Sequence, residues 1–215
     1  MKDLVQIKRI INSPVSSNCY IVSLPNRNDC IVVDPGTPDP VSIVSFCREN
    51  NLEPEYAILT HEHYDHCIGY NELKRYYPDI KLICSSVCAQ NIRLPEWNLS
   101  KYAENVMQTS IQEADIHIED TSNPLNWNNC FIRFFLTEGH SKGSICFSID
   151  EKFLFTGDTL IPGYKTITKL KGGSKEKLSE SLNRLSNYFK GKESELIIYP
   201  GHGESVLFKE INHKD

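Results

Sequence analysis

Short apolar runs that end in turns alternate with helical stretches in both halves of this 215-residue chain. The run CIVV at 30–33 stops at a Pro-Gly turn, and YAILT at 56–60 leads directly into a histidine-rich segment. Such runs are typical of buried strands. The stretch at 174–189 instead spaces its leucines and its phenylalanine three or four residues apart, which predicts an amphipathic helix. Alternating strands and helices predict an α/β fold in which helices cover the sheets.

The sequence predicts one domain over residues 1–215. No internal repeat, low-complexity stretch or linker interrupts it, and its length fits one sizeable domain. The segment at about 87–113 is helical but irregular in pattern, and it contains Pro95, Trp97 and Tyr102. We interpret this segment as a helical insertion that packs over the body of the domain or forms a lid.

Charge and apolar content limit the partners of the protein. The formal net charge is -5, and the acidic residues are spread along the chain, which argues against a surface built to bind nucleic acid. No apolar stretch is long enough to span a bilayer, and the N-terminal MKDLVQIKRI lacks the apolar core of a secretory signal. We therefore expect a cytoplasmic protein that acts on a small molecule, without a membrane or nucleic-acid partner. The sequence gives no indication of the oligomeric state.

The eight cysteines stand singly inside apolar runs. This placement is typical of small hydrophobic residues in a core. Without a secretory signal, a disulfide framework is not expected. The one close pair, Cys84 and Cys88, lacks the CxxC spacing and has no second pair that would complete a metal site.

The segment THEHYDH at 60–66 carries four metal-type ligands directly after a predicted strand. In an extended segment, side chains two residues apart point the same way. His61 and His63 can therefore offer imidazoles to one metal ion. Asp65 and His66, at the start of the following helix, would face a second ion. Gly69 would let that helix approach the sheet closely.

Three further turns each supply one ligand at the end of a predicted strand. They are EGHS, TGDT and PGHG, which contain His140, Asp158 and His202. Imidazole and carboxylate ligands without thiolate suit zinc, iron or manganese, and seven ligands are too many for one tetrahedral ion. We expect two divalent ions, most simply zinc, with three histidines on the first ion. Asp65, His66 and His202 would hold the second, and Asp158 would bridge the two.

Two other histidines do not fit this pattern. His117 lies in the alternating segment IHIED and is expected to be an ordinary strand residue, whereas His213 is expected to be solvated near the end of the sequence. We assign neither to the metal site.

The order of these motifs resembles the metallo-β-lactamase superfamily over nearly the whole chain. HxHxDH is followed by a histidine in GHS, an aspartate in GDT and a histidine in PGHG. The resemblance implies an αββα four-layer sandwich with the metal ions at one edge of the paired sheets. It also implies that Asp34, in VVDPG, supports the metal-binding loops from behind, since ligating histidines usually donate their other N–H to such groups. The ligands that it implies are His61, His63, Asp65, His66, His140, Asp158 and His202.

THEHYDH, GDTL and YPGHGE together are most similar to the glyoxalase II-like, or hydroxyacylglutathione hydrolase-like, branch. Enzymes of that branch cleave S-acylglutathione thioesters. The resemblance implies that a hydroxide held by two metal ions attacks the thioester carbonyl, while Asp65 helps to hold or receive the proton.

The chain departs from that branch after its GDTL motif. Shorter relatives carry a Gly-Arg-Thr-Asp-like segment there, whereas this sequence has IPGYKTITKLKGGS at 161–174. We expect Tyr164 and Lys165 to take over substrate contacts. Full-length enzymes of the branch add a helical domain after PGHG, and in this sequence about a dozen residues follow that turn.

Other activities of the same superfamily stay open. A persulfide dioxygenase-like oxidoreductase would use one iron held by two histidines and an aspartate, and a lactonase or phosphodiesterase would use the same two ions on another substrate. A nuclease is disfavoured because the 87–113 segment offers only Arg93 and Lys101 as basic residues. In such a fold the loops around the metal site determine which substrate binds. The metal ligands alone therefore do not indicate which of these activities the protein has.

Overall fold

The computed structural model describes residues 5–104, 106–119 and 121–210. By its internal contacts the chain divides into two units. Unit 1 comprises residues 1–84 and 89–117, and unit 2 comprises residues 85–88 and 118–215. The prediction of a single domain over 1–215 stays a prediction.

The sheet of unit 1 is mixed and has the strand order β1-β2-β3-β4-β5-β6. The first three strands pair antiparallel, whereas β3, β4 and β5 pair parallel. All six residues of β2 are buried, as expected of a strand that is covered on both faces. The strands are β1 (Gln6–Ile11), β2 (Asn18–Ser23), β3 (Asp29–Val33), β4 (Glu53–Ile58), β5 (Lys81–Ser85) and β6 (Ile116–Ile118).

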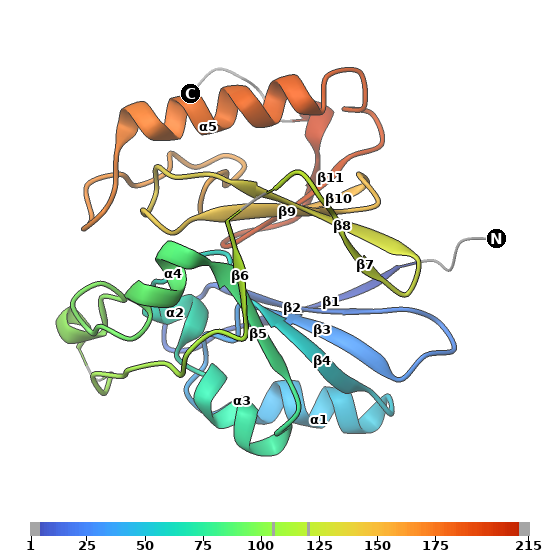
Figure 1. Ribbon diagram of the computed structural model, residues 1–215, viewed down its shortest axis with the longest axis vertical. Helices are drawn as coiled ribbons and strands as arrows, with labels where there is room; N and C mark the ends of the chain where they lie inside the picture. The colour runs from blue at the N-terminus through green and yellow to red at the C-terminus, as the bar shows by residue number, and fades with distance from the viewer. Residues whose placement is uncertain (1–4, 105, 120, 211–215) are drawn as a thin grey trace. The chain divides into compact units, whose positions relative to one another are not determined.

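Two helices, α1 (Val41–Glu49) and α3 (Tyr70–Tyr76), lie along one face of this sheet (Figure 1). Ile43, Val44 and Cys47 form the buried stripe of α1, and the spacing of these apolar residues is that of an amphipathic helix. A short helix α2 (Tyr64–Cys67) precedes α3.

The segment at 87–113 contains less helix than its sequence pattern suggests. It holds most of α4 (Ser86–Asn91) and the 3-10 turn η1 (Ser100–Tyr102). Asn98 is buried and donates from its side-chain amide to the carbonyls of Ile92 and Thr109. Asn98 thus links the backbone at Ile92 to the backbone at Thr109, near the two ends of the segment.

The sheet of unit 2 is also mixed, with the order β12-β11-β10-β9-β8-β7. Only β10 and β11 pair parallel, while the other neighbours pair antiparallel. Its strands are β7 (Leu125–Trp127), β8 (Cys130–Leu136), β9 (Ile145–Ile149), β10 (Phe153–Gly157), β11 (Ile197–Pro200) and β12 (Val206–Leu207). A 3-10 turn, η2 (Phe208–Glu210), follows β12.

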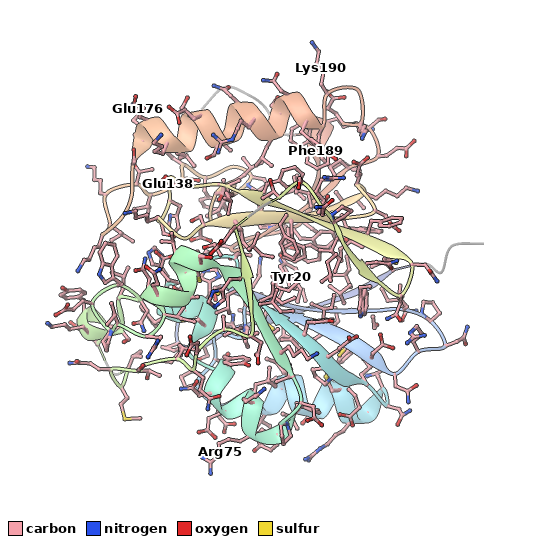
Figure 2. The ribbon with its side chains drawn as sticks, in the orientation of Figure 1. Tyr20, Arg75, Glu138, Glu176, Phe189 and Lys190 are labelled. Carbon is pink, nitrogen blue, oxygen red and sulfur yellow. The ribbon has the colours of Figure 1, made fainter. Side chains whose placement is uncertain are left out.

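The helix α5 (Lys175–Tyr188) lies along one face of the unit 2 sheet (Figure 1). Ser174 caps it, because its hydroxyl accepts a hydrogen bond from the Lys177 amide. Leu185 and Phe189 pack into a buried cluster with residues of β9, β10 and β11. In Figure 2, Phe189 points toward the sheet, whereas Glu176 and Lys190 point away from it. The α/β class is confirmed, since each unit is a mixed sheet with helix along one face.

Two further expectations concern the burial of the cysteines and the length of apolar helices. All eight cysteines are buried free thiols, so their interpretation as core residues is confirmed. Among the described residues, no helix is both long enough and apolar enough to cross a bilayer.

Candidate metal centre

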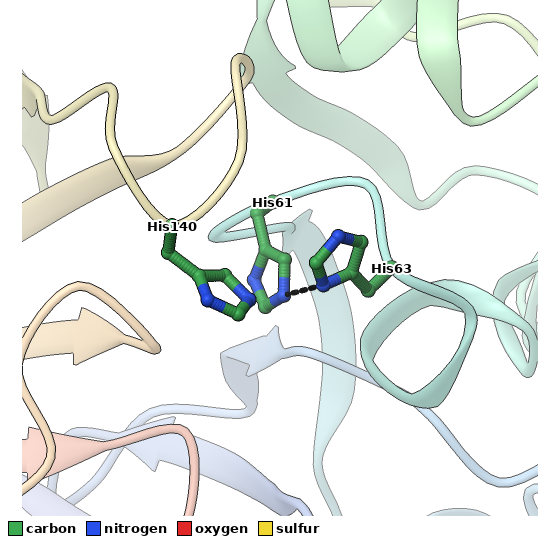
Figure 3. Close-up of side chains that lie close together, drawn as sticks. All are labelled: His61, His63 and His140. Atoms are coloured by element: carbon green, nitrogen blue, oxygen red, sulfur yellow. Dashed lines mark hydrogen bonds between the residues drawn. The ribbon is translucent and has the colours of Figure 1, made fainter. Parts of the chain in front are cut away.

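Unit 1 presents its predicted ligands His61 and His63 in the loop between β4 and α2, and Asp65 and His66 in α2 itself. Residues 60–62 bend and are not extended, so the strand alternation from which we predicted the pairing of His61 and His63 does not hold there. The two rings still meet, because His61 Nε2 lies 3.1 Å from His63 Nδ1. The dashed line in Figure 3 marks this hydrogen bond. The ligand atoms of His61 and His66 lie within 4.8 Å of each other, as do those of Asp65 and His66.

Asp34, at the end of β3, anchors this loop. One of its carboxylate oxygens accepts from the Thr60 amide at 2.7 Å, and the other accepts from the Thr60 hydroxyl at 2.7 Å. The second oxygen also lies 3.0 Å from His66 Nδ1. The backbone of Asp34 has φ 51°, a left-handed conformation that aspartate tolerates better than most residues. Three contacts therefore hold one buried carboxylate against residues 60–66, the segment that we call the histidine loop.

These contacts assign the protons on two of the histidines. The Thr60 hydroxyl has one proton and donates it to Asp34, so it accepts from His61 Nδ1–H, which lies 3.1 Å away. His66 Nδ1 faces a carboxylate, which only accepts, and therefore also carries a proton. Each ring is left with its Nε2 lone pair as the atom that can bind a metal ion.

A buried asparagine that the sequence did not mark fixes the backbone around the loop. The side chain of Asn12 donates to Ser17 Oγ and to the carbonyl of Asp34. It accepts from the Gly36 amide and from the Thr37 hydroxyl. Ser17 Oγ in turn donates to the carbonyl of Asp65. The partners of Asn12 are distant in sequence, and no local pattern reveals them.

The 87–113 segment is bonded to the same loop. The Tyr64 amide donates to the carbonyl of Asn98 at 2.7 Å. Asn91 donates from its side-chain amide to the carboxylate of Glu62 at 2.9 Å, and Glu62 is fully buried between the two histidines that flank it. Whether the segment moves as a lid stays a prediction, but its attachment to the histidine loop is direct.

Unit 2 presents the other three predicted ligands around one carboxylate oxygen. Asp158 Oδ2, just after β10, lies 3.6 Å from His140 Nε2 and 3.5 Å from His202 Nε2. His140 Nδ1 donates to the carbonyl of Ile167 at 2.8 Å, so its Nε2 carries the lone pair. Asp158 Oδ2 is therefore near both imidazole nitrogens, but each distance is longer than that of an ordinary hydrogen bond.

These donor sets fit metal ions. Two nitrogens bound to one tetrahedral zinc at the usual bond length lie roughly 3.3–3.4 Å apart, and the two nitrogens of His61 and His63 are 3.1 Å apart. Three histidines keep Nδ1 bonded to the protein and leave Nε2 available, which is the usual arrangement of ligating histidines. The donors are nitrogen and oxygen only, as in zinc, iron and manganese sites.

The remaining predicted residues have simpler surroundings. His117 is exposed and contacts the carbonyl of Ala114, whereas His213 lies outside the described residues. Tyr164 is 70% exposed, and its ring edge lies beside Gly203, the neighbour of His202. Lys165 is exposed next to it.

The cysteines near the ligands are not poised for chemistry. Burial, together with the negative charge of Asp65, raises the pKa of the Cys67 thiol well above its usual value. Burial raises the pKa of Cys146 to about 11. Both thiols are therefore neutral at pH 7, and a neutral thiol is a poor nucleophile and a poor metal ligand.

Replacing Asp34 with asparagine should weaken metal binding by about 10–100-fold, the usual effect of removing a partner of a ligating histidine. An asparagine amide has one acceptor oxygen, so it cannot accept from the Thr60 amide at one end and from the Thr60 hydroxyl and His66 at the other, as the carboxylate does. The measurement is a zinc titration against a competing chelator. Asp29→Asn, at the start of the same strand and paired with Arg27, is the matched control and should bind metal as the wild type does. Equal affinity of Asp34→Asn and wild type would remove Asp34 from the site.

Replacing His117 with glutamine should leave the number of metal ions per chain unchanged, because this exposed side chain lies at a backbone carbonyl of its own segment, that of Ala114. Elemental analysis of the purified variant measures this number. If the variant lost a metal ion, the choice of histidines would be wrong.

Known proteins resemble this chain in sequence. The model of the Metallo-beta-lactamase superfamily matches residues 12–202. A hydroxyacylglutathione hydrolase of Citrobacter koseri is 28% identical over 80% of this chain and 59% of its own length. A hydroxyacylglutathione hydrolase of Klebsiella pneumoniae is 29% identical over 82% of this chain and 60% of its own length. The chain thus spans about 60% of the length of these relatives.

Among solved structures, the BLEG-1 B3 metallo-beta-lactamase superposes with a TM-score of 0.85. It is 24% identical, and the match covers 95% of each chain. This likeness and the family match confirm the predicted fold class, the α/β fold of the metallo-β-lactamase type, with two mixed sheets flanked by helices.

Proposed function

The chain belongs to the metallo-β-lactamase superfamily, and from that membership we propose that it is a metal-dependent hydrolase. The observation that carries the proposal is the proton arrangement of the histidines. His61, His66 and His140 each have Nδ1 bonded within their own unit and Nε2 left as a ligand atom. Metal-ligating histidines usually have this arrangement, in which the other ring nitrogen is held by a protein acceptor.

We propose the ligands that the sequence predicts. His61, His63 and His140 would hold one divalent ion, Asp65, His66 and His202 would hold the second, and Asp158 would be the ligand shared by both. The close approach of Asp158 Oδ2 to two imidazoles in unit 2 supports its bridging role. Zinc is the proposed metal, with iron and manganese as alternatives that the same ligands accept.

When bound, such a pair of ions supplies an activated water and polarises a carbonyl oxygen. The protein provides the rest of the chemistry. Asp34 keeps the histidine loop in place, and the contact of Ser17 with the Asp65 carbonyl fixes the backbone at Asp65. The Asp65 carboxylate, partly exposed beside His66, holds or receives the proton of the attacking water.

We propose a thioester, such as an S-acylglutathione, as the substrate. The names and the similarity of the curated relatives support this choice. Tyr164 and Lys165 are proposed to contact the substrate, because Tyr164 lies beside the turn that carries His202. A small-molecule substrate without nucleic acid, and a cytoplasmic location, belong to the same proposal.

The test is chelator-sensitive turnover of S-lactoylglutathione, followed by the release of its thiol. We expect cleavage by the metal-loaded protein, loss of cleavage after chelation and recovery on adding metal. A higher KM with little change in kcat is expected for Tyr164→Ala if Tyr164 contributes to substrate binding. Cleavage of a lactone or a phosphodiester without thioester cleavage would overturn the substrate while keeping the hydrolase. A single iron with dioxygen consumption on a persulfide would favour the dioxygenase-like alternative.

A further inference from the structure

A pocket of about 490 Å³ lies between α5 and β8 in unit 2. Its volume is within the range of small-molecule sites in proteins. No proposed metal ligand lines it. The pocket is therefore a separate feature of unit 2 that the proposed hydrolase chemistry does not use.

The pocket combines an apolar wall with two positively charged side chains. Phe135 of β8 packs edge-on against Tyr188 of α5, with ring centroids 4.9 Å apart, and Leu185 lies one turn earlier on the helix. Arg133 enters from β8 and Arg184 from α5. The strand β8 and the helix α5 thus each supply an arginine and aromatic side-chain surface to the pocket. Such a lining suits a ligand that has a negatively charged head and an apolar body.

The surroundings leave both guanidinium groups able to bind such a head. Arg184 donates to the carbonyl of Leu136 and to Ser181 Oγ, and Arg133 donates to the carbonyl of Ser122. Each guanidinium has five N–H donors, so several donors stay available. Neither group forms an ion pair with a carboxylate among the described residues.

Glu151, whose charge Arg133 also stabilises, is already bound to two other groups. Glu151 accepts from Tyr188 Oη and pairs with Lys192. The hydrogen bond from Lys192, and after it the one from Tyr188, lowers the pKa of the Glu151 carboxyl. Glu151 therefore stays charged and bound to these partners. No acidic residue is among the described residues that line the pocket. The lining itself is thus positively charged.

We propose that this pocket binds a small organic anion, with Arg133 and Arg184 on its carboxylate or phosphate head and its flat apolar body against Phe135, Leu185 and Tyr188. Guanidinium groups match carboxylate and phosphate with paired hydrogen bonds and also lie well on aromatic rings. Arg133 already lies 5.8 Å from the Tyr188 ring, which shows that the cationic and aromatic parts of the pocket adjoin. The site is independent of the proposed hydrolase activity.

The test is a nuclear magnetic resonance titration of the metal-loaded, isotope-labelled protein with three naphthalene probes. 2-Naphthoate and 2-naphthylphosphonate carry the two anionic heads, and 2-naphthamide is a neutral control of the same shape. Each titration is repeated after chelation, because a carboxylate can also bind a metal ion. The variants are Arg184→Gln and Arg133→Gln, and Lys175→Gln at the other end of α5 is the matched control, since Lys175 does not line the pocket.

We expect at least one anion to shift the amide signals of residues 133–136 and 181–188, with or without metal. The neutral amide and both arginine variants should bind at least about fivefold more weakly, and Lys175→Gln should bind as the wild type does. The stronger anion identifies the head group as carboxylate or phosphate. Equal binding of the neutral amide, unchanged binding in both arginine variants, or signals that shift only when metal is present would each overturn the proposal. Circular dichroism confirms that the variants are folded.

Discussion

Replacing Asp158 with alanine should lower the metal content and reduce kcat/KM for the thioester by about a thousandfold, since a metal site of this kind contributes several kcal/mol to catalysis. The carboxylate oxygen that lies between His140 and His202 in unit 2 would be absent. The two imidazoles would lose their shared anionic neighbour, and both proposed ions would lose their bridging ligand. The measurements are elemental analysis and thioester turnover on the same sample.

The Asp158 variant needs a check on its fold, because the residue is largely buried. Asp158→Asn keeps the shape of the side chain and removes its charge, so it should fold normally and still lose metal. Full metal occupancy together with unchanged turnover in both variants would contradict the assigned role.

Replacing Gly36 with alanine should destabilise the protein by about 3 kcal/mol, as overpacking of a rigid site does. A Cβ at this position would lie 1.6 Å from the carbonyl oxygen of Asp65 and 2.8 Å from the side-chain amide of Asn12. The clash is with backbone, so the histidine loop must move. We expect a fall in melting temperature of roughly 6–12 °C and weaker metal binding in the same variant.

Gly163→Ala separates this clash from backbone strain. Gly163 has φ 77°, and a Cβ added there would have no other atom within 4 Å, so alanine at this position is strained but not crowded. It should cost about 1–2 kcal/mol and leave the metal affinity unchanged. If Gly36→Ala bound metal as tightly as Gly163→Ala, the packing of the loop against Gly36 would not position the ligands.

The strands were largely predictable because most of them are apolar runs that end in turns. The run CFIRFFL coincides with β8, and SICFSI overlaps β9. Two strands gave no such signal: β7 is three residues long and contains an asparagine, and β12 has only two residues. The helix predicted to start at Asp65 and His66 is split, because α2 ends at Cys67 and α3 begins at Tyr70. Gly69 packs there against the backbone of Thr37, in the loop after β3.

The sequence proposes ligands for the site but not their supports. Histidine and aspartate spacing picks out candidate ligands, because metal binding restricts residue type. The supports are set by tertiary contacts: Asn12 reaches Asp65 across 53 residues of sequence, and the carbonyl of Ile167 orients His140 from 27 residues away. Every residue type has a backbone carbonyl, so the sequence alone cannot identify Ile167 as the partner of His140. Arg133 and Arg184 are likewise brought to one pocket only by the packing of α5 against β8.

Counting the metal ions bound per chain is the most direct test of the two-ion site. Protein loaded with zinc, iron or manganese and freed of excess metal is analysed for all three elements, with His117→Gln as control. We predict about two ions per chain, removable by a chelator and retained in the control. One ion or none per chain in folded, metal-loaded protein would contradict the assignment.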